Sequence, residues 1–332
     1  MNRDLRALPK VELHVHLEGS MRATTVVEFA ERYGVELPDG LRDGRYVFRD
    51  FRHFIDEWVA GLRCLRSPED FRRIALEFSQ DQADEGIRYQ EVFFSLPDHA
   101  GKIRDWDETL EAVLDGFAEG ARRFGVRTGL LVDVVRGIDM RLSRRAMKVA
   151  ARHGDAGVLG LTLGGEEGFP PEPYAGIFAD ARAAGLRSVP HAGETRGPAS
   201  IRGAVGALGA DRIGHGIRAL EDAALVDMLI HRGIALDVCP TSNLRTRSVP
   251  SLAEHPLPAM LEAGLTCTVG SDDPSMFGSR LTGEYEVCRS VFGFDDEAIA
   301  ALALAGVGAS FADEGTKQGL AAEIRAWISA PA

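Results

Sequence analysis

The sequence predicts an α/β fold, a (β/α)₈ TIM barrel with a helical insertion after the first strand and extra helices at the C-terminal end. Eight short runs of β-type residues recur along the chain, and most are separated by stretches with helical periodicity. Strands that alternate with helices indicate a parallel sheet, and eight such units favour a closed barrel over an open doubly wound sheet. With 332 residues, 45% of them hydrophobic, and without repeats or a long linker, the chain is expected to form a single domain over residues 1–332.

The predicted strands share a short apolar core bounded by turn residues. In chain order they cover residues 11–17, 88–95, 126–135, 158–163, 187–191, 212–215, 234–238 and 265–269. Helical periodicity is clearest at residues 142–152, 174–184, 223–232 and 257–263. Each of these helices lies between two predicted strands, as a parallel barrel requires.

The first connection is unusually long and contains an amphipathic helix. Its apolar positions follow helical spacing at Phe51, Phe54, Ile55, Trp58 and Leu62. Periodicity leaves two alternatives open: the helix covers the mouth of the barrel, or it packs on the outer helices. After Leu281 the pattern predicts three or more helices and no further strand, so these helices are expected to pack outside the barrel.

Composition restricts the class of partner and the compartment. The chain has 38 basic and 50 acidic residues, a net charge of -12, which argues against nucleic acid or an anionic membrane as a partner. We find no signal-peptide pattern and no apolar run near the roughly 20 residues that span a bilayer, so a cytoplasmic protein is expected. The four cysteines form no C-x-x-C pair, which predicts buried free thiols rather than disulfides or a cysteine zinc site.

The first predicted strand carries alternating polar residues. Its period of two places Glu12, His14, His16 and Glu18 on one face. Two imidazoles two residues apart can bind one metal ion, although the solvated face of an amphipathic strand gives the same pattern. In a parallel barrel both faces of a strand are covered, so this polar face is expected to point into the barrel.

Three further polar clusters follow later strands: His-Ala-Gly-Glu at 191–194, Arg-Ile-Gly-His-Gly at 212–216, and Gly-Ser-Asp-Asp-Pro at 270–274. Taken singly, such histidines are more often structural, and such carboxylates more often serve turns and helix caps. All four clusters, however, fall at the C-terminal rim of the predicted barrel, where active sites of this fold lie. Three histidines and a carboxylate form a suitable shell for Zn²⁺ with room for an activated water. The remaining histidines are expected to be solvated: His53, His99, His153, His231 and His255.

These motifs resemble those of the adenosine deaminase family of the amidohydrolase superfamily. H-x-H-L-x-G, H-A-G-E, G-H-G and D-D-P occur in the family's order from Val11 to about Tyr285. The resemblance implies one zinc ion per chain, held by His14, His16, His191 and Asp272. It further implies that Glu194 donates a proton to the purine ring, that His215 orients the attacking water and helps to deprotonate it, and that Asp273 and the backbone of Gly165 hold ring nitrogens.

The implied roles agree with the chemistry of hydrolytic deamination. An aromatic amine leaves after hydroxide attack has broken ring conjugation, and protonation of the ring nitrogen makes that attack easier. Glu194 lies three residues after His191 and is close enough to supply that proton. The H-x-E and P-C-x-x-C signature of the other zinc deaminase class is absent, since Cys239-Pro240 reverses the order.

The departures from the family pattern concern the substrate. Glu18 stands where many adenosine deaminases have an aspartate associated with the ribose hydroxyl, and Thr162 replaces another aspartate; the segment from Tyr89 to Phe94 is similar to the adenine deaminase branch. The first expectation is a small 6-aminopurine substrate, adenosine converted to inosine and ammonia, with adenine and aminodeoxyfutalosine left open. Another amidohydrolase reaction, or an inactive barrel that binds a nucleoside or a protein, are the remaining alternatives. The sequence does not indicate the oligomeric state.

Overall fold

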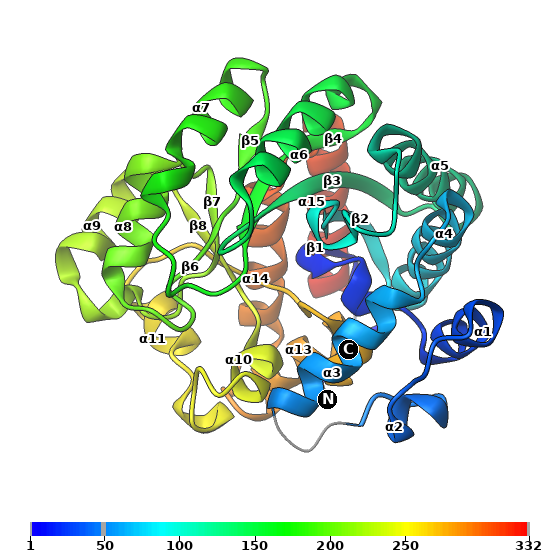
Figure 1. The fold of residues 1–332 in the computed structure, drawn as a ribbon. Helices are drawn as coiled ribbons and strands as arrows, with labels where there is room; N and C mark the ends of the chain where they lie inside the picture. The colour runs from blue at the N-terminus through cyan, green and yellow to red at the C-terminus, as the bar shows by residue number, and fades with distance from the viewer. Residues whose placement is uncertain (1, 48–50, 331–332) are drawn as a thin grey trace.

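The strands form a closed parallel barrel (Figure 1). The computed structural model describes residues 2–47 and 51–330, with side chains from residue 57 onward in the second range. Within them the strands pair in chain order, in sheets β1 to β5 and β6 to β9. They are β1 Lys10–His16, β2 Ile87–Phe94, β3 Arg127–Val135, β4 Val158–Gly164, β5 Arg187–Ser188, β6 His191–Ala192, β7 Arg212–His215, β8 Ala235–Val238 and β9 Cys267–Val269. The predicted (β/α)₈ fold is confirmed.

The fifth predicted strand is divided into β5 and β6. Val189 and Pro190 lie between the two parts, and proline cannot donate a hydrogen bond to a ladder. The backbone still bridges its neighbours, because Val189 N donates to Leu161 O at 2.9 Å and Gly214 N donates to Pro190 O at 3.0 Å. The nine segments therefore occupy eight positions around the barrel.

The barrel closes between β1 and the residues that follow β9. His16 N donates to Asp272 O at 2.8 Å, and Asp272 N donates to His14 O at 3.1 Å. These hydrogen bonds join the first strand to the segment that follows the last strand, which closes the barrel. It also brings the polar face of β1 beside the paired aspartates.

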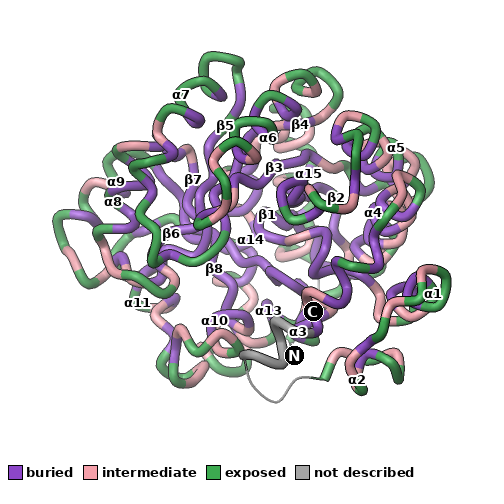
Figure 2. The backbone as a smooth tube through the Cα atoms, viewed as in Figure 1, coloured by how far each residue is buried: buried purple, intermediate pink, exposed green. Residues whose placement is uncertain are grey.

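The helices surround the barrel and leave the strands buried inside (Figure 2). Four of them, α6, α7, α9 and α11, coincide with the stretches of clearest helical periodicity. The helices are α1 Ala23–Tyr33, α2 Asp39–Arg42, α3 Phe51–Arg63, α4 Pro68–Asp84, α5 Trp106–Phe124, α6 Met140–Arg152, α7 Ala175–Ala183, α8 Pro198–Ala207, α9 Ala223–Arg232, α10 Pro240–Arg245, α11 Leu257–Glu262, α12 Pro274–Phe277, α13 Leu281–Ser290, α14 Asp296–Ala309 and α15 Glu314–Ser329.

Helix α3 of the first connection packs on the loops at the mouth of the barrel. Trp58 contacts the apolar pair Met276 and Phe277 of α12, which directly follows the aspartates after β9. Of the two alternatives for this helix, the structure favours the mouth. Leu62, another predicted position of the apolar stripe, is buried. The side chains of Phe51, Phe54 and Ile55 lie outside the described residues.

The opposite end of the barrel is filled by the C-terminal segment. Helix α14 packs against β1 and β9, as expected for helices outside the barrel. Phe311, which follows α14, reaches inward and packs on Phe93, Leu131 and Val189. Since side chains close this end, a substrate has to approach from the mouth.

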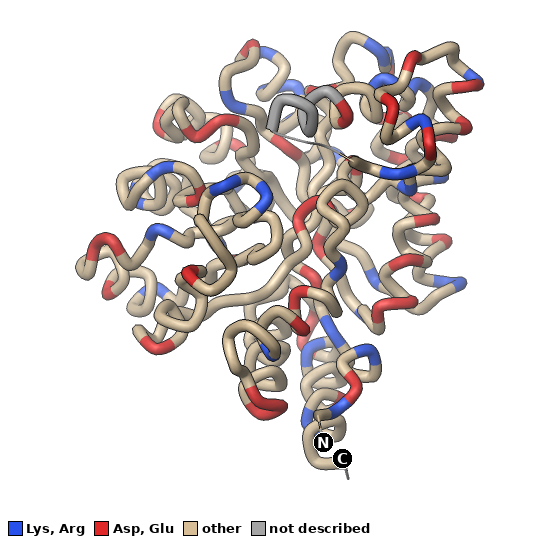
Figure 3. The backbone as a smooth tube through the Cα atoms, turned by 90° about the horizontal axis from the view of Figure 1, so that it is seen from below, with Lys and Arg blue, Asp and Glu red and all other residues tan. Residues whose placement is uncertain are grey.

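Most charged residues lie at the surface of the molecule, and the cysteines lie in its interior. The charged residues lie mostly on the outer helices and loops (Figure 3). All four cysteines are buried and free, as predicted. In the part of the chain that the structure describes, no helix has the length and apolarity needed to cross a bilayer.

Candidate metal centre and active site

Four potential ligands converge at the mouth of the barrel. His14 and His16 come from β1, His191 from β6 and Asp272 from the residue pair after β9, and one ligand atom of each lies within 4.8 Å of all the others. His16 Nε2 lies 3.2 Å from His191 Nε2 and 3.3 Å from Asp272 Oδ1. His14 Nε2 lies 3.4 Å from the same carboxylate oxygen. The structure thus brings together the four residues predicted to bind metal.

The donor set and its burial fit a zinc ion. His14 is fully buried, and neither of its ring nitrogens has a hydrogen-bond partner among the described residues. Leaving such polar atoms unpaired is unfavourable unless a ligand satisfies them. Three imidazoles and one carboxylate suit Zn²⁺. Burial lowers the pKa of His14 to about 3, which keeps the imidazole in the neutral form that binds metal.

A second grouping combines His14 and Asp272 with His215 and Cys239, and its ligand atoms also lie within 4.8 Å of one another. A cysteine binds metal as the thiolate. Burial raises the pKa of the Cys239 thiol well above its usual value, and the neighbouring Asp272 charge adds to this effect. The grouping with His16 and His191 is therefore the better metal site.

Two hydroxyl groups, on Thr162 and Ser242, contact the candidate ligands His191 and Asp272. Thr162 Oγ1 lies 3.0 Å from His191 Nδ1, which leaves Nε2 of that ring facing the other ligands. Ser242 Oγ donates to Asp272 Oδ2 at 2.5 Å. Such outer contacts fix ligand orientation. Thr162, a departure from the family pattern at the sequence level, keeps a hydrogen-bonding group at this position.

Glycines in two of the motifs allow the close approach of site residues. A Cβ atom on Gly214 would lie 2.8 Å from Cε1 of His14, and one on Gly19 would lie 1.7 Å from Oδ1 of Asp273. Any larger residue would displace these side chains. The glycines of the G-H-G and H-x-H-L-x-G motifs are thus explained by packing.

Two site residues have a left-handed backbone that is uncommon outside glycine. His215 and Asp272 both have φ of 63°. A non-glycine residue in this region costs of order 1–3 kcal/mol and persists where the surrounding structure enforces it. His215 is the last residue of β7 and Asp272 follows β9, so both strained positions lie at the candidate site.

The side chains of Glu194 and His215 face one another beside the ligands. Glu194 Oε2 lies 3.6 Å from His215 Nε2. The other oxygen, Oε1, accepts hydrogen bonds from Thr246 Oγ1 at 2.9 Å and from Ser248 Oγ at 3.3 Å. Thr246 and Ser248 were not predicted as site residues, because nothing in the sequence of a polar loop after α10 distinguishes them.

A buried carboxylate, Glu167, holds the loop that carries Glu194. Its oxygens accept hydrogen bonds from the backbone N–H groups of residues 193–196, at 2.5 to 3.0 Å, and from Ser200 Oγ at 2.8 Å. Burial alone would raise the pKa of Glu167, but these hydrogen bonds lower it below its usual value. No sequence pattern indicates Glu167, since its partners lie 26 or more positions away in the chain.

The predicted substrate-binding residues differ in their surroundings. Gly165 follows β4 and Asp273 lies beside Asp272 at the mouth. Burial, and then the charge of Asp272, raise the pKa of Asp273 well above its usual value. Glu18 is turned away from solvent, with Oε1 accepting from Ser95 N at 3.0 Å and lying 3.3 Å from His99 Nε2.

A further buried acid, Asp133, lies near these residues and was not predicted. It lies on β3, opposite Thr162 of β4. Its Oδ1 has no hydrogen-bond partner in the described ranges. Burial raises the pKa of Asp133 to about 8, against the influence of His16. An unpaired polar atom at this depth is available to a ligand.

Two histidines expected to be solvated are instead buried, so that prediction is wrong for His99 and His255. Each has polar partners that replace water: His99 lies against Glu18, and His255 lies 3.2 Å from Asn243 Oδ1. His231 is exposed as predicted, whereas His153 is partly buried and lies 3.0 Å from Asp107 Oδ1; the side chain of His53 is outside the described residues.

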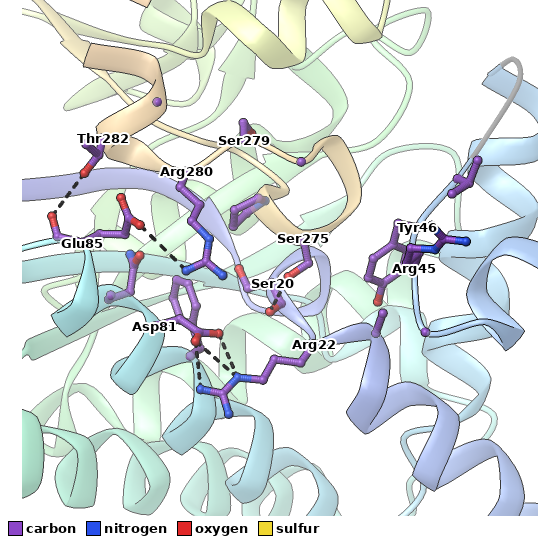
Figure 4. Close-up of a pocket in the computed structure, with 18 of the residues that line it drawn as sticks. Ser20, Arg22, Arg45, Tyr46, Asp81, Glu85, Ser275, Ser279, Arg280 and Thr282 are labelled. Atoms are coloured by element: carbon purple, nitrogen blue, oxygen red, sulfur yellow. Dashed lines mark hydrogen bonds and ion pairs between the residues drawn. The ribbon is translucent and has the colours of Figure 1, made fainter. Parts of the chain in front are cut away.

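A cavity of about 730 Å³ lies between α4 and the segment from α12 to α13 (Figure 4). Ser275 Oγ donates to Ser20 O at 2.9 Å across its wall, and Arg22 pairs with Asp81 at 2.8 Å. None of the candidate metal, catalytic or substrate residues lines it. The cavity therefore does not belong to the candidate active site.

Comparison with known proteins decides the family. The sequence model of the family described as adenosine deaminase matches residues 9–327. This chain belongs to that family. It is 39% identical to an aminodeoxyfutalosine deaminase of Acidothermus cellulolyticus, over 85% of this chain and 83% of that protein. It is 38% identical to an adenine deaminase of Rhodospirillum rubrum, over 97% of each chain.

Solved structures of the family have the same fold. An adenine deaminase of Arthrobacter aurescens superposes with a TM-score of 0.89 at 33% identity, over 97% of this chain and 99% of its own. An amidohydrolase of Burkholderia ambifaria, solved with bound Zn, gives a TM-score of 0.90 at 29% identity, over 98% and 92%. The chain is thus a metal-dependent purine deaminase that hydrolyses a C–N bond. The names of these relatives do not single out adenosine.

Proposed function

We propose that this chain deaminates a 6-aminopurine by hydrolysis with one bound zinc ion, and that free adenine is its substrate. The observation that carries the proposal is the cluster of His14, His16, His191 and Asp272 at the barrel mouth, with Glu194 and His215 beside it. The same set combines a metal shell with a proton donor, and hydrolytic deamination needs both.

Zinc would be held by His14, His16, His191 and Asp272. Bound there, it supplies the Lewis acidity that makes water a competent nucleophile near neutral pH. The unpaired ring nitrogens of buried His14 support this assignment.

The protein's own side chains orient the reactants and move the protons. Glu194 donates a proton from its carboxyl group to the ring nitrogen next to C6, so that negative charge does not build up on the ring during attack. His215 orients the attacking water. Asp273 and the peptide N–H of Gly165 hold two further ring nitrogens, which keeps C6 facing the water. The proton that the water loses replaces the one that Glu194 has given to the ring. As the tetrahedral carbon collapses to a carbonyl, its hydroxyl proton passes to the amino group, which leaves as ammonia.

Free adenine is favoured over adenosine by two buried carboxyl groups. Glu18 occupies the position associated with a ribose hydroxyl, but its Oε1 is engaged by Ser95 N and His99. Oδ1 of Asp133 has no hydrogen-bond partner among the described residues. The side chain lies near the end of β4, because its Oδ2 would be 3.9 Å from a Cβ atom built on Gly164. Oδ1 can accept a hydrogen bond from the ring N–H of a free base, which a nucleoside lacks.

A nucleoside with a modified 5′ end is the second candidate. It is favoured by the 39% identity to a protein named aminodeoxyfutalosine deaminase. Glu18 Oε1 is already engaged by Ser95 and His99, so a different polar group would have to bind the ribose of such a substrate.

The test is deamination of adenine, adenosine and aminodeoxyfutalosine by one zinc-supplemented preparation, followed by absorbance. We expect kcat/KM to be highest for adenine. Asp133→Asn should raise KM for adenine more than it lowers kcat, with Asp155→Asn on the exposed surface as the matched control. Preferred turnover of either nucleoside, or an unchanged KM in Asp133→Asn, would refute free adenine as the substrate.

A further inference from the structure

A chain of hydrogen bonds runs behind His215, away from the ligands. The backbone N–H of Leu257 donates to Nδ1 of His255 at 3.2 Å. Nε2 of His255 lies 3.2 Å from Oδ1 of Asn243, and Nδ2 of Asn243 lies 3.2 Å from Nδ1 of His215. Asn243, His255 and His215 are all buried, and His255 also stacks on Phe292.

The polarity of this chain follows from its first member. A backbone N–H can only donate, so Nδ1 of His255 is an acceptor and the proton of that ring is on Nε2. Burial lowers the pKa of His255 to about 4, which keeps the ring neutral. The Nε2–H must then donate to the oxygen of Asn243, since an amide oxygen only accepts. The amide nitrogen of Asn243 consequently faces His215.

We infer that Asn243 and His255 are positioning residues that fix the tautomer of His215, with its proton on Nε2. The amide N–H of Asn243 occupies the lone pair of Nδ1, and a neutral imidazole carries its proton on the other nitrogen. Nε2 is the ring atom that faces Glu194 Oε2, at 3.6 Å, and Asp272 Oδ2, at 3.9 Å. His215 therefore presents a hydrogen-bond donor to the reaction site.

The consequence for the reaction rests on the proposed function. The family resemblance implies that His215 both orients the attacking water and helps to deprotonate it. With Nδ1 occupied by Asn243 and a proton on Nε2, the ring donates a hydrogen bond to the water oxygen and has no free lone pair with which to accept its proton. His215 thus orients the nucleophile through its Nε2–H. The backbone N–H of Leu257, 42 residues further along the chain, determines that the proton lies on this nitrogen.

The tautomer can be measured directly by NMR on the protein labelled with ¹⁵N-histidine, with and without zinc. The two ring nitrogens of a neutral imidazole give separate signals according to which one is protonated, and His215→Asn identifies the signals of this ring by their loss. We expect His215 to be protonated on Nε2 and unprotonated on Nδ1. A proton on Nδ1 of the zinc-loaded wild type would overturn the inference, whatever the variants do.

Reversing the polarity of the chain supplies the kinetic test. In Asn243→Asp the carboxylate can only accept, so the proton of His215 should move to Nδ1. The zinc content should remain at the wild-type level, while kcat for the 6-aminopurine falls about a hundredfold, as for loss of one preorganised donor, and KM changes little. An Asn243→Asp enzyme with unchanged kcat would contradict the inference.

His255→Gln is the conservative variant, because its side-chain amide can still donate to Asn243. It should keep the Nε2–H tautomer and most of kcat, whereas His255→Leu should lose both. His231→Gln, the same substitution at an exposed histidine, is the matched control. If the wild type turned over no 6-aminopurine, the proposed function would fail, but the NMR result would still decide the tautomer.

Discussion

Among the described residues, two buried polar clusters inside the barrel differ in how completely their polar atoms are paired. One of them is the set of candidate ligands His14, His16, His191 and Asp272, which we call the metal cluster. Beneath it, Arg212 of β7 pairs with Asp237 Oδ2 at 2.5 Å and with Glu91 Oε2 at 2.7 Å. Thr268 Oγ1 donates to Asp237 and Tyr89 Oη donates to Glu91. We call these five residues the Arg212 cluster. None of its polar side-chain atoms is left without a partner.

The metal cluster at the mouth is built differently. Both ring nitrogens of His14 and one oxygen each of Asp133 and Asp273 lack hydrogen-bond partners in the described part of the chain. His215 and Asp272 have left-handed backbones. The comparison indicates that the Arg212 cluster holds strands together, whereas the mouth is preorganised for a metal and a substrate that complete it.

Removing a metal ligand should have the largest effect. His16→Ala is expected to lose zinc and to have no detectable turnover, because two imidazoles and a carboxylate remain for an ion that needs the full shell. Zinc content per chain and deaminase activity measure this. His231→Ala, at an exposed position, should retain both; a zinc-loaded and active His16→Ala protein would refute the assigned ligands.

Neutralising the proposed proton donor should lower turnover strongly without loss of the metal. Glu194→Gln is expected to bind zinc as the wild type does and to reduce kcat by about 10²- to 10⁴-fold, the usual contribution of general acid catalysis. Glu221→Gln, at an exposed residue that pairs with Arg218, serves as the control. Loss of zinc from Glu194→Gln would place this residue among the ligands instead.

Breaking the Arg212 cluster should affect stability rather than chemistry. Arg212→Met leaves the buried carboxylates of Asp237 and Glu91 without a positively charged partner, and we expect the free energy of unfolding to fall by about 3–5 kcal/mol. Urea denaturation measures this change. Folded Arg212→Met should still bind zinc; a variant as stable as the wild type would show that the cluster does not hold the strands together.

Glu167→Gln should have the smallest effect, and one that depends on pH. Because the folded pKa of Glu167 is lowered, its carboxylate stabilises the fold fully above the ordinary pKa of 4.5 and loses that contribution as the pH falls through the folded pKa. We expect Glu167→Gln to cost about 1–3 kcal/mol at pH 7 and less at lower pH. Exposed Glu166→Gln is the control, and a pH-independent difference would contradict this role.

The sequence predicted the barrel and the metal cluster because both have local patterns. Alternating polar residues mark His14 and His16, and short motifs at strand ends mark His191 and Asp272. The residues it missed, such as Glu167, Asn243 and His255, act through partners far away in the chain. The prediction that His99 and His255 are solvated was wrong for the same reason. A position in a loop does not reveal that a tertiary contact replaces water.

Removal and return of the metal, with adenine turnover followed on one sample, is the decisive experiment. We expect one zinc per chain, loss of turnover when a chelator removes it, and recovery when zinc is restored. Turnover that persists in the zinc-free protein would refute a zinc-dependent deaminase, as would a zinc-loaded protein that deaminates none of adenine, adenosine and aminodeoxyfutalosine.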